Sequence, residues 1–576
     1  MTTHHKQKPA TLPLLHFPPS GLPACSSSPR PRCPRIIHGA QDHSPQVAHQ
    51  THPSSLTSDF ISSTEEIDNH GVLEESNQAK NHGAVTGEGA KRPKKWRQPW
   101  PATGCDGGQE AAGGGVDRME EEEEVGASSS SPPIAQLGYD QLLSVLRLLP
   151  PEAVLSFAAT CRAFRAWSSS DALWEALCRR DWGPRAAAAL AERRRERGGA
   201  PPPWRRVYAE VARLGALTAR RVPVRGASPR PRASHSLNLV AGWLVLFGGG
   251  CEGGHHLDDT WVAYAGIGAE NRLPAVLNWQ QLASGTPSGR FSHSCTLVGD
   301  TLVMFGGITD RGQRLNDTWI GQVISEEPQR MRISWRLLEV GPLAPPPRGA
   351  HAACCVDDKF IVIHGGVGLY GSRLGDTWLL DLSNGLQSGS WHQIGNAWPL
   401  PPPRSGHSLT WIGGTHMVLF GGRGSEFEVL NDVWLFDISD HYPKWKELKY
   451  NLSSALGEMP FPRVGHSAIL ALGGKVLVYG GEDSQRRRKD DFWILDTLAL
   501  LQYESGSKKV TKRMWKKLTI DGQCPNYRSF HGACVDTSGC CVYIFGGMVD
   551  GLVHPAEAMG LRFDGQLYQV ELVLHL

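Results

Sequence analysis

A Gly-Gly pair recurs six times in the part of the chain after residue 230, each time at the end of an apolar run and downstream of a histidine. Neighbouring histidines are 58, 58, 56, 59 and 65 residues apart. A motif that returns at so regular an interval predicts an array of repeated supersecondary units. The histidines are His235, His293, His351, His407, His466 and His531, and the pairs begin at Gly248, Gly306, Gly365, Gly421, Gly480 and Gly546.

Each unit has the pattern of four short β-strands. In the first unit, residues 234–240 and 243–247 are two apolar or β-branched runs separated by a tight turn. A third strand follows Asp259, and a fourth begins near Trp279. Four strands cannot bury both faces of their small sheet, so the units are predicted to stack radially as propeller blades. The tryptophans are predicted to fill the space between blades.

These units resemble the kelch repeat, in which an arginine, a histidine, a strand ending in Gly-Gly and two downstream aromatic residues follow one another. An arginine stands three residues before each histidine: Arg232, Arg290, Arg348, Arg404, Arg463 and Arg528. The resemblance covers about residues 229–572 and implies an all-β kelch propeller of about six four-stranded blades. In the sixth unit, Glu557-Ala558-Met559 stands where Asp-Thr-Trp is expected, which predicts weaker outer strands there.

Two segments compete for the strand that closes the ring. Residues 567–572 alternate as an outermost strand would, and residues 217–224 precede the first repeat as an outer strand would. We favour six blades in which the C-terminal strand is the outermost strand of the last blade. Closure by the N-terminal strand is the alternative.

A second signature lies upstream of the repeats. Leu142, Leu146 and Leu149 have helical spacing, and Pro150-Pro151 ends that helix before another begins. Residues 137–182 resemble an F-box, although Gly138 stands where the family usually has a proline. The resemblance implies a small all-α unit that binds a Skp1-like adaptor through Leu137, Leu142, Leu146, Leu149, Pro150 and Leu155. An ordinary helical bundle packed on the propeller is the alternative.

These features divide the chain into four parts: a low-complexity N-terminal extension over 1–132, the F-box over 133–182, a helical linker over 183–216 and the propeller over 217–576. The extension is rich in Ser, Pro, His and Gly and carries an acidic run after Met119. Such a segment buries too little apolar surface to offset its ordering entropy, so we expect it to be disordered. A shorter product that starts at Met119 is also conceivable.

The composition of the chain and the repeated histidines exclude several classes of function. A formal charge of +2 over 576 residues argues against general nucleic-acid binding, and no apolar stretch is long enough to cross a membrane. The 13 cysteines are scattered, which favours reduced thiols. A histidine that is needed once per blade serves the blade, so we expect no catalytic residue, metal or cofactor. Neither the Glu-x-x-x-Asp-x-x-x-His iron motif nor the flavin-binding Asn-Cys-Arg motif of some kelch proteins occurs.

An F-box joined to a kelch propeller implies the substrate-receptor subunit of an SCF-type ubiquitin ligase, without catalytic activity of its own. Its partners would be a Skp1-like adaptor, a cullin and a RING subunit bound through that adaptor, and an unknown protein substrate. We expect it in the nucleus, the cytoplasm or both. A kelch scaffold in a non-ligase complex is the rival interpretation, and the sequence leaves the oligomeric state open.

The loops after each Gly-Gly pair are predicted to lie on one side of the ring, because they join the same two strands in every blade. They differ in sequence, which is typical of a recognition surface in a repeat array. Arginines outnumber acids there and suit a phosphorylated or acidic segment of the target. Solvated loop charges are the alternative. The candidate substrate-binding residues are Arg311, Arg314, Arg373, Arg423, Arg486, Arg487 and Arg488.

Overall fold

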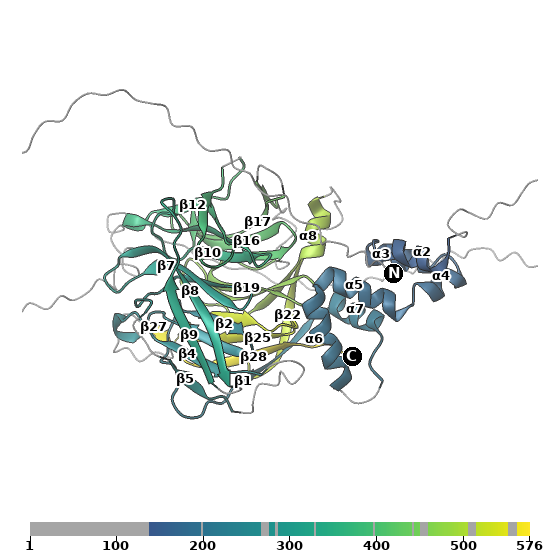
Figure 1. The fold of residues 1–576 in the computed structure, drawn as a ribbon, viewed down its shortest axis with the longest axis horizontal. Helices are drawn as coiled ribbons and strands as arrows, with labels where there is room; N and C mark the ends of the chain where they lie inside the picture. The colour runs from purple at the N-terminus through teal and green to yellow at the C-terminus, as the bar shows by residue number, and fades with distance from the viewer. Residues whose placement is uncertain are drawn as a thin grey trace, which may run out of the picture. The chain divides into compact units, whose positions relative to one another are not determined.

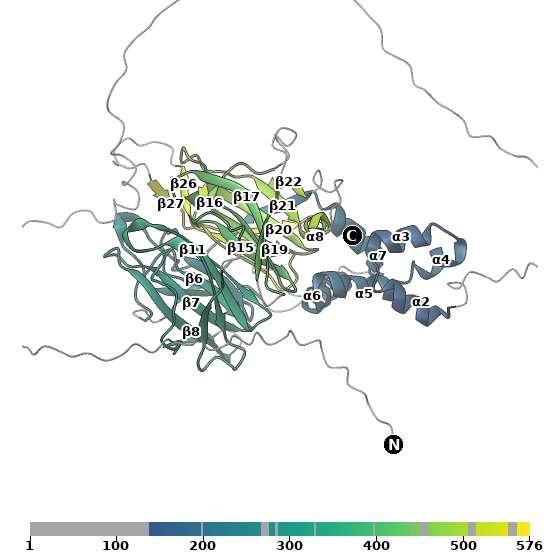
Figure 2. The ribbon, with the colours of Figure 1, turned by 90° about the horizontal axis from the view of Figure 1, so that it is seen from above.

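In the computed structural model, short helices are followed by a β-propeller (Figures 1 and 2). No helix in the part of the chain that it describes is long and apolar enough to cross a membrane. The low-complexity extension 1–132 lies outside that part. The described residues are 137–196, 200–266, 276–282, 286–327, 330–395, 398–439, 443–449, 459–504, 514–550 and 561–575.

The helices that precede the propeller are α2 (Tyr139–Leu146), α3 (Pro151–Ala158), α4 (Arg162–Trp167), α5 (Asp171–Trp182), α6 (Pro184–Glu196) and α7 (Trp204–Arg213). Two of them, α3 and α6, begin with a proline, whose fixed φ suits the first helical turn. The helices α5 and α7 pack on each other, and the rings of Trp174 and Tyr208 meet edge-on with centroids 5.5 Å apart. Tyr208 also donates a hydrogen bond of 2.8 Å to Asp181, so its ring packs in the apolar core while its hydroxyl has a hydrogen-bond partner.

The propeller has six four-stranded antiparallel blades. Their first strands contact one another in a closed cycle, β2–β6–β10–β15–β19–β24–β2, which completes the ring. Blade 1 contains β2 (Ser236–Val240), β3 (Trp243–Phe247), β4 (Thr260–Tyr264) and β5 (Trp279–Gln281), and blade 2 contains β6 (Ser294–Val298), β7 (Thr301–Ile308), β8 (Arg314–Glu327) and β9 (Arg330–Leu337). Blade 3 contains β10 (Ala352–Val356), β11 (Phe360–Val367), β12 (Arg373–Asp381) and β13 (Ser390–Gln393).

Blade 4 contains β15 (Ser408–Gly413), β16 (His416–Gly424), β17 (Val429–Asp437) and β18 (Lys444–Glu447), with the short β14 (Arg404–Ser405) paired to β16. Blade 5 contains β19 (Val464–Ala471), β20 (Lys475–Glu482), β21 (Phe492–Asp496) and β22 (Trp515–Gly522), and α8 (Thr497–Glu504) follows β21. Blade 6 contains β24 (Gly532–Val535), β25 (Cys541–Phe545), β28 (Leu567–Leu572) and β1 (Ala216–Arg221). A separate small sheet joins β23 (Arg528–Ser529), β26 (Met548–Asp550) and β27 (Leu561–Phe563).

The N-terminal strand β1 closes the ring. It is the outermost strand of blade 6 and pairs antiparallel with β28, which is the third strand of that blade. The favoured prediction that 567–572 is the outermost strand is therefore wrong. Residues 567–572 supply the third strand, and residues that precede the first repeat supply the fourth. On its other edge β1 also pairs in parallel with β22 of blade 5, which joins the two blades.

A ring of backbone hydrogen bonds encircles the propeller axis. In each blade, the residue just before the repeated histidine donates its N–H to the carbonyl of the equivalent residue in the preceding blade, and the first blade bonds to the sixth. The six bonds are 2.7–2.9 Å long, and all six residues have φ between 53° and 68°. This left-handed conformation places each N–H toward its neighbour and is compensated by the closed set of bonds. The residues are Ser234, Ser292, Ala350, Gly406, Gly465 and Phe530.

Tryptophans on the fourth strands fill the joins between blades, as the sequence predicts. Each packs on the aromatic residue that precedes Gly-Gly in the blade before it, with ring centroids 4.9–5.8 Å apart. The fourth strand of blade 6 is β1, which has no tryptophan. There Tyr479 of blade 5 stacks on Phe492 of its own blade at 4.2 Å. The five pairs are Trp279–Phe545, Trp335–Phe247, Trp391–Phe305, Trp445–His364 and Trp515–Phe420.

Candidate functional site

The repeated arginines are structural. Each is completely buried and forms a close ion pair with an aspartate near the start of the third strand of its blade. Burial alone would raise the pKa of Asp376, but the hydrogen bonds and charge of Arg348 hold it below its usual value. Guanidiniums that are buried in ion pairs within the blade are not available to a ligand. The pairs are Arg232–Asp259, Arg290–Asp317, Arg348–Asp376, Arg404–Asp432, Arg463–Asp491 and Arg528–Asp564.

The sixth pair corrects the sequence assignment of the last repeat. Glu557-Ala558-Met559 lies outside the described residues, and the carboxylate that pairs with Arg528 comes from Asp564, 2.8 Å away. Tyr568 pairs with Ile544 across the strands as Trp261 pairs with Leu246 in blade 1. Tyrosine has taken the place of the usual tryptophan, which is why the sequence motif was not recognised.

The repeated histidines serve the joins between blades. In four of them Nε2 is hydrogen-bonded, at 2.8–3.1 Å, to the serine that follows the histidine of the preceding blade. Ala352 and Gly532 replace that serine in blades 3 and 6, so His407 and His235 lack this bond. Burial, followed by the charge of Arg290, lowers the pKa of His293 to about 3, so the ring is neutral. Among the described residues, no group of three or more His, Cys, Asp or Glu side chains could hold a metal ion.

The exposed apolar side chains of the helical region overlap only partly with those that the sequence suggests. Of the six predicted residues, Leu142 and Leu146 are buried, Leu137 and Leu149 are half-buried, and Pro150 and Leu155 are exposed. Helical spacing in α2 therefore marked its inward face. The large apolar side chains that the prediction missed are Tyr139, Val145 and, most exposed at 81%, Leu148.

Arg180 fixes the turn that presents Leu148. Its Nη1 atom donates hydrogen bonds to the carbonyl oxygens of Arg147 and Leu149, at 2.7 and 2.9 Å. Both carbonyls lie in the turn that follows α2, beyond its last residue Leu146, where no helical N–H pairs with them. Its Nε and Nη2 atoms bond to Asp181. The exposed turn is thus tied to α5 rather than left loose.

The seven predicted substrate-binding arginines lie along one edge of the propeller. Adjacent strands in a blade are antiparallel, so the loop between the second and third strands leaves from the same edge as the connection to the next blade. We call this edge the loop face. Arg311 lies in the loop between the second and third strands of blade 2, and Arg314 and Arg373 begin the third strands of blades 2 and 3. Arg423 is the last residue but one of the second strand of blade 4. Residues 486–488 lie in the corresponding loop of blade 5.

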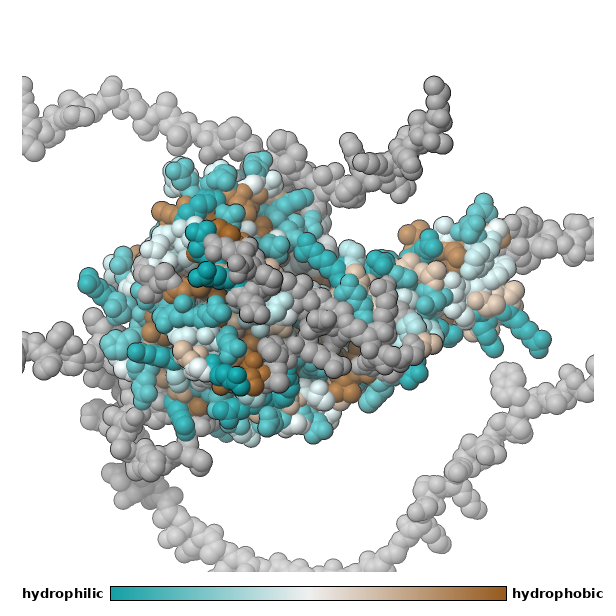
Figure 3. Space-filling model, turned by 60° about the horizontal axis from the view of Figure 1, so that its bottom comes forward, coloured by the Kyte–Doolittle hydropathy of each residue, from teal (hydrophilic) through white to brown (hydrophobic). Residues whose placement is uncertain are grey.

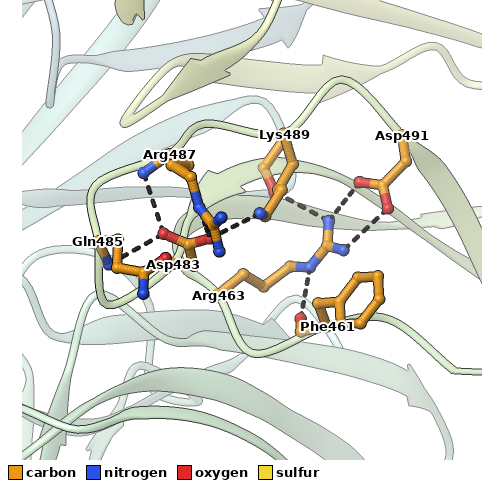
Figure 4. Close-up of polar contacts among 8 residues, drawn as sticks. Phe461, Arg463, Asp483, Gln485, Arg487, Lys489 and Asp491 are labelled. Carbon is orange, nitrogen blue, oxygen red and sulfur yellow. Dashed lines mark hydrogen bonds and ion pairs between the residues drawn. The ribbon is translucent and has the colours of Figure 1, made fainter. Parts of the chain in front are cut away.

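Two of the three arginines of the blade 5 loop, Arg487 and Arg488, are engaged within the chain, and Figure 4 shows the contacts of Arg487. Asp483 accepts hydrogen bonds from Nε of Arg487 at 2.9 Å and from Nζ of Lys489 at 2.8 Å. Although burial acts in the opposite direction, these contacts lower the pKa of Asp483 to about 2. Arg488 is buried beside Glu482 and Ser529, with its Nε donating to the serine hydroxyl at 3.2 Å. This loop therefore offers less free positive charge than its sequence indicates.

Three other arginines are half-buried and incompletely satisfied. Arg314 and Arg373 occupy equivalent positions at the start of the third strand, opposite Ile308 and Val367. Each donates one hydrogen bond from Nη1 to a nearby glycine carbonyl, and Arg423 lies 3.6 Å from Glu482. The Nε atoms of Arg314, Arg373 and Arg423 have no hydrogen-bond partner among the described residues. Burial lowers the pKa of all three.

Large apolar side chains are exposed along the same edge, and the sequence analysis missed them. In one view of the surface, apolar patches are interspersed among polar residues (Figure 3). The signal that could have found them is a bulky apolar residue in a connection between strands, where no strand buries it. Those on second-to-third-strand loops or inter-blade connections are Leu343, Leu369, Tyr370, Trp398, Phe427, Phe461 and Tyr527.

Comparison with known proteins identifies both the helical region and the propeller. The profile of the KLHDC2/KLHL20/DRC7 Kelch-repeats domain matches residues 211–422, 385–497 and 414–563, and the F-box-like profile matches residues 136–180. F-box/kelch-repeat protein At1g51550 of Arabidopsis thaliana is 49% identical over 456 residues, which are 77% of this chain and 93% of that protein. Adagio-like protein 3 of Oryza sativa subsp. japonica is 30% identical over 416 residues, 71% of this chain.

The chain spans 60% of the length of that Adagio-like relative. A helical F-box-like region followed by a six-bladed kelch ring defines a class of two-module proteins. The chain belongs to the F-box/kelch-repeat family, whose members are typically non-catalytic adaptors.

Proposed function

We propose that this chain is the substrate receptor of an SCF-type ubiquitin ligase. The observation that carries the proposal is the presence, in one chain, of an F-box-like region over 136–180 and a kelch propeller with an irregular loop face. The F-box would bind a Skp1-like adaptor and, through it, a cullin and a RING subunit. The propeller would bind the target protein.

The exposed apolar residues of the helical region supply the contact with the adaptor. Val145, Leu148, Pro150 and Leu155 are accessible as the chain stands, and each large aliphatic side chain covered by a partner contributes roughly 1.5–3 kcal/mol. The hydrogen bonds of Arg180 hold Leu148 in place before the adaptor arrives, which reduces the ordering cost of binding. The buried Leu142 and Leu146 support this surface from within.

The chain contributes proximity rather than chemistry. A target held on the propeller while the adaptor holds the ligase core experiences a raised effective concentration of the charged ubiquitin-conjugating enzyme. The buried histidines and the paired arginines of the blades are committed to the fold, so no residue of the repeats is required as an acid or a base.

The target is proposed to bind on the loop face through an acidic or phosphorylated segment. The Nε–H groups of the half-buried Arg314, Arg373 and Arg423 have no acceptor in the part of the chain that the structure describes. Guanidinium groups bind carboxylate and phosphate with two parallel hydrogen bonds. Arg311 and Arg486 are exposed on the same edge and add positive charge to it.

Affinity purification of the full chain from cells tests the ligase proposal. We expect a Skp1-like adaptor, a cullin and a RING subunit to co-purify, and a variant with Leu148 and Leu155 replaced by serine to lose all three together. If the wild-type chain recovers the adaptor without a cullin or a RING subunit, the result would instead support a kelch scaffold in a non-ligase complex.

A further inference from the structure

Arg373 of blade 3 and Arg423 of blade 4 meet at the join between these blades on the loop face. Arg423 pairs with Ser405 of β14, and β14 contacts both β11 and β12 of blade 3. The guanidinium of Arg373 lies over the ring of Phe427, in the loop of blade 4, 4.8 Å from its centroid. Side chains from two blades therefore form one cluster.

The two guanidiniums lack counter-charges that fully satisfy them. Burial lowers the pKa of Arg373 first, and the positive charge of Arg423 lowers it further. Glu482 lies 3.6 Å from Arg423, and both Nε–H groups are without an acceptor among the described residues. Two like charges that are partly withdrawn from water repel each other, and an anion bound between them would relieve that repulsion.

The loops that flank the two arginines expose aromatic side chains in a costly conformation. Tyr370 is fully exposed although its φ is 57°, and Phe427 is substantially exposed with a φ of 63°. A residue with a side chain pays conformational free energy in the left-handed region, and an exposed ring recovers little of it by packing within the chain. Strain of this kind is concentrated at ligand-binding sites.

We propose that Arg373, Arg423, Tyr370 and Phe427 bind a side-chain carboxylate of the target next to a large apolar side chain of the same segment. This inference rests on the proposed function and specifies the chemistry of its target. The carboxylate would take the unused donors of the two arginines, and the apolar side chain would pack on the exposed rings.

A carboxylate suits this cluster better than a phosphate. Glu482 already offsets part of the charge of Arg423, and Glu428 acts in the same direction on Arg373. Because these two carboxylates already lie near the two guanidiniums, the cluster suits a ligand with one negative charge rather than two. A phosphate group carries nearly two charges and is more costly to withdraw from water.

Selection from a random peptide library tests the inference, with the full chain purified in complex with a Skp1-like adaptor. We expect enriched peptides to carry Asp or Glu within a few residues of an aromatic or large aliphatic residue. For an enriched peptide made synthetically, replacing that Glu by Gln should weaken binding about tenfold, the loss expected for a charged hydrogen bond. Phosphoserine at that position should bind no more tightly than Glu.

Variants of the protein locate the site. The double variant Arg373→Gln/Arg423→Gln and the double variant Tyr370→Ser/Phe427→Ser should each lose the enriched peptides by about tenfold or more while keeping the wild-type melting temperature. Lys359→Gln, an exposed cation on the β10–β11 turn at the opposite edge of blade 3, and Leu498→Ser in α8 are the matched controls and should bind normally.

Three outcomes overturn the inference: no enrichment, enrichment of peptides without acidic residues, or enrichment that both double variants retain. Much tighter binding of the phosphoserine peptide would assign the cluster to phosphate instead. Capture of the adaptor is measured in the same preparation and depends on the helical region. If the adaptor binds normally but no peptides with an acidic residue near a large apolar residue are enriched, this inference is wrong and the ligase proposal is unaffected.

Discussion

Trp391, on the fourth strand of blade 3, packs its ring against Phe305 of blade 2, with the centroids 4.9 Å apart. Both side chains are almost completely buried in the cluster between these two blades, which also holds Trp378. The contact joins two residues that are 86 positions apart, so it stabilises the assembly of blades rather than any one hairpin.

Replacing Trp391 by Ala should lower the free energy of unfolding by about 3–5 kcal/mol, as truncation of a buried aromatic side chain does. Trp398 is the matched control, because it lies in the next inter-blade connection and is 88% exposed. Its replacement by Ala should change stability by less than about 0.5 kcal/mol. Denaturant titration of both variants measures the difference, and similar losses would contradict the assignment of Trp391 to the inter-blade core.

Closure by β1 gives a prediction at Gly522. A Cβ atom there would lie 2.3 Å from the carbonyl oxygen of Ala219 in β1, and the residue also has φ of 89°. Gly226 has φ of 77° but open space around it. Gly522→Ala should therefore lower the melting temperature clearly more than Gly226→Ala, since only the first displaces β1. If the two variants melt alike, the pairing of β1 with β22 adds nothing to stability.

The propeller could be predicted because each blade repeats the same evidence. Six copies of arginine, histidine and Gly-Gly define six units, even though the third strand of the last unit carries Tyr568 in place of tryptophan. Ring closure was harder. Residues 217–224 and 567–572 both have a strand pattern. Only the pairing in the folded chain shows that 567–572 is the third strand of blade 6 and that β1 is the fourth.

The candidate surfaces were harder to predict, because the type of a residue does not determine whether its side chain is exposed. Leu142 and Leu148 are both leucines of one segment, yet the first is buried and the second exposed. Arg487 and Arg423 are both loop-face arginines, but the first bonds to Asp483, whereas the Nε–H of the second has no acceptor within the described ranges. These differences arise from contacts between elements that are distant in sequence, such as the approach of Arg423 to Glu482 of the next blade.

Acidification should destabilise the propeller through its buried histidines. Burial, and then the charge of Arg404, lowers the pKa of His364 from 6.5 to about 3. The unfolded chain thus binds a proton below about pH 6.5 that the folded chain refuses until about pH 3, so stability is lost as the pH falls through this interval. At pH 5 this one group should cost about 2 kcal/mol relative to pH 7.5.

The variant His364→Phe tests this, because phenylalanine stands at the same position in blades 1, 2, 4 and 6. It should lose less stability than wild type between pH 7.5 and pH 5, by about 2 kcal/mol in denaturant titrations. An unchanged pH dependence would mean that His364 titrates normally in the fold.

Charge-reversal variants in the blade 5 loop should differ in stability according to whether the arginine is buried or exposed. Arg488 is buried beside Glu482, so Arg488→Glu places two carboxylates together and should cost about 3–5 kcal/mol. The exposed Arg486 lies two residues earlier, and Arg486→Glu should cost less than about 0.5 kcal/mol. Thermal melts compare them. A loss of target binding after reversal of all three arginines would consequently report damage to the loop, and the Arg373 and Arg423 variants are the cleaner probes.

The last prediction concerns the adaptor surface. Leu148→Ser/Leu155→Ser removes two exposed apolar side chains, and should weaken binding of a Skp1-like adaptor by about 100-fold or more while leaving the melting temperature unchanged. Leu142→Ala/Leu146→Ala removes two buried side chains instead and should lower helical stability by several kcal/mol, about 2–5 for each leucine. Binding titration and circular dichroism of both double variants distinguish surface from core. Adaptor affinity that survives the Leu148 and Leu155 replacements in a folded protein would place the contact elsewhere on the helical region.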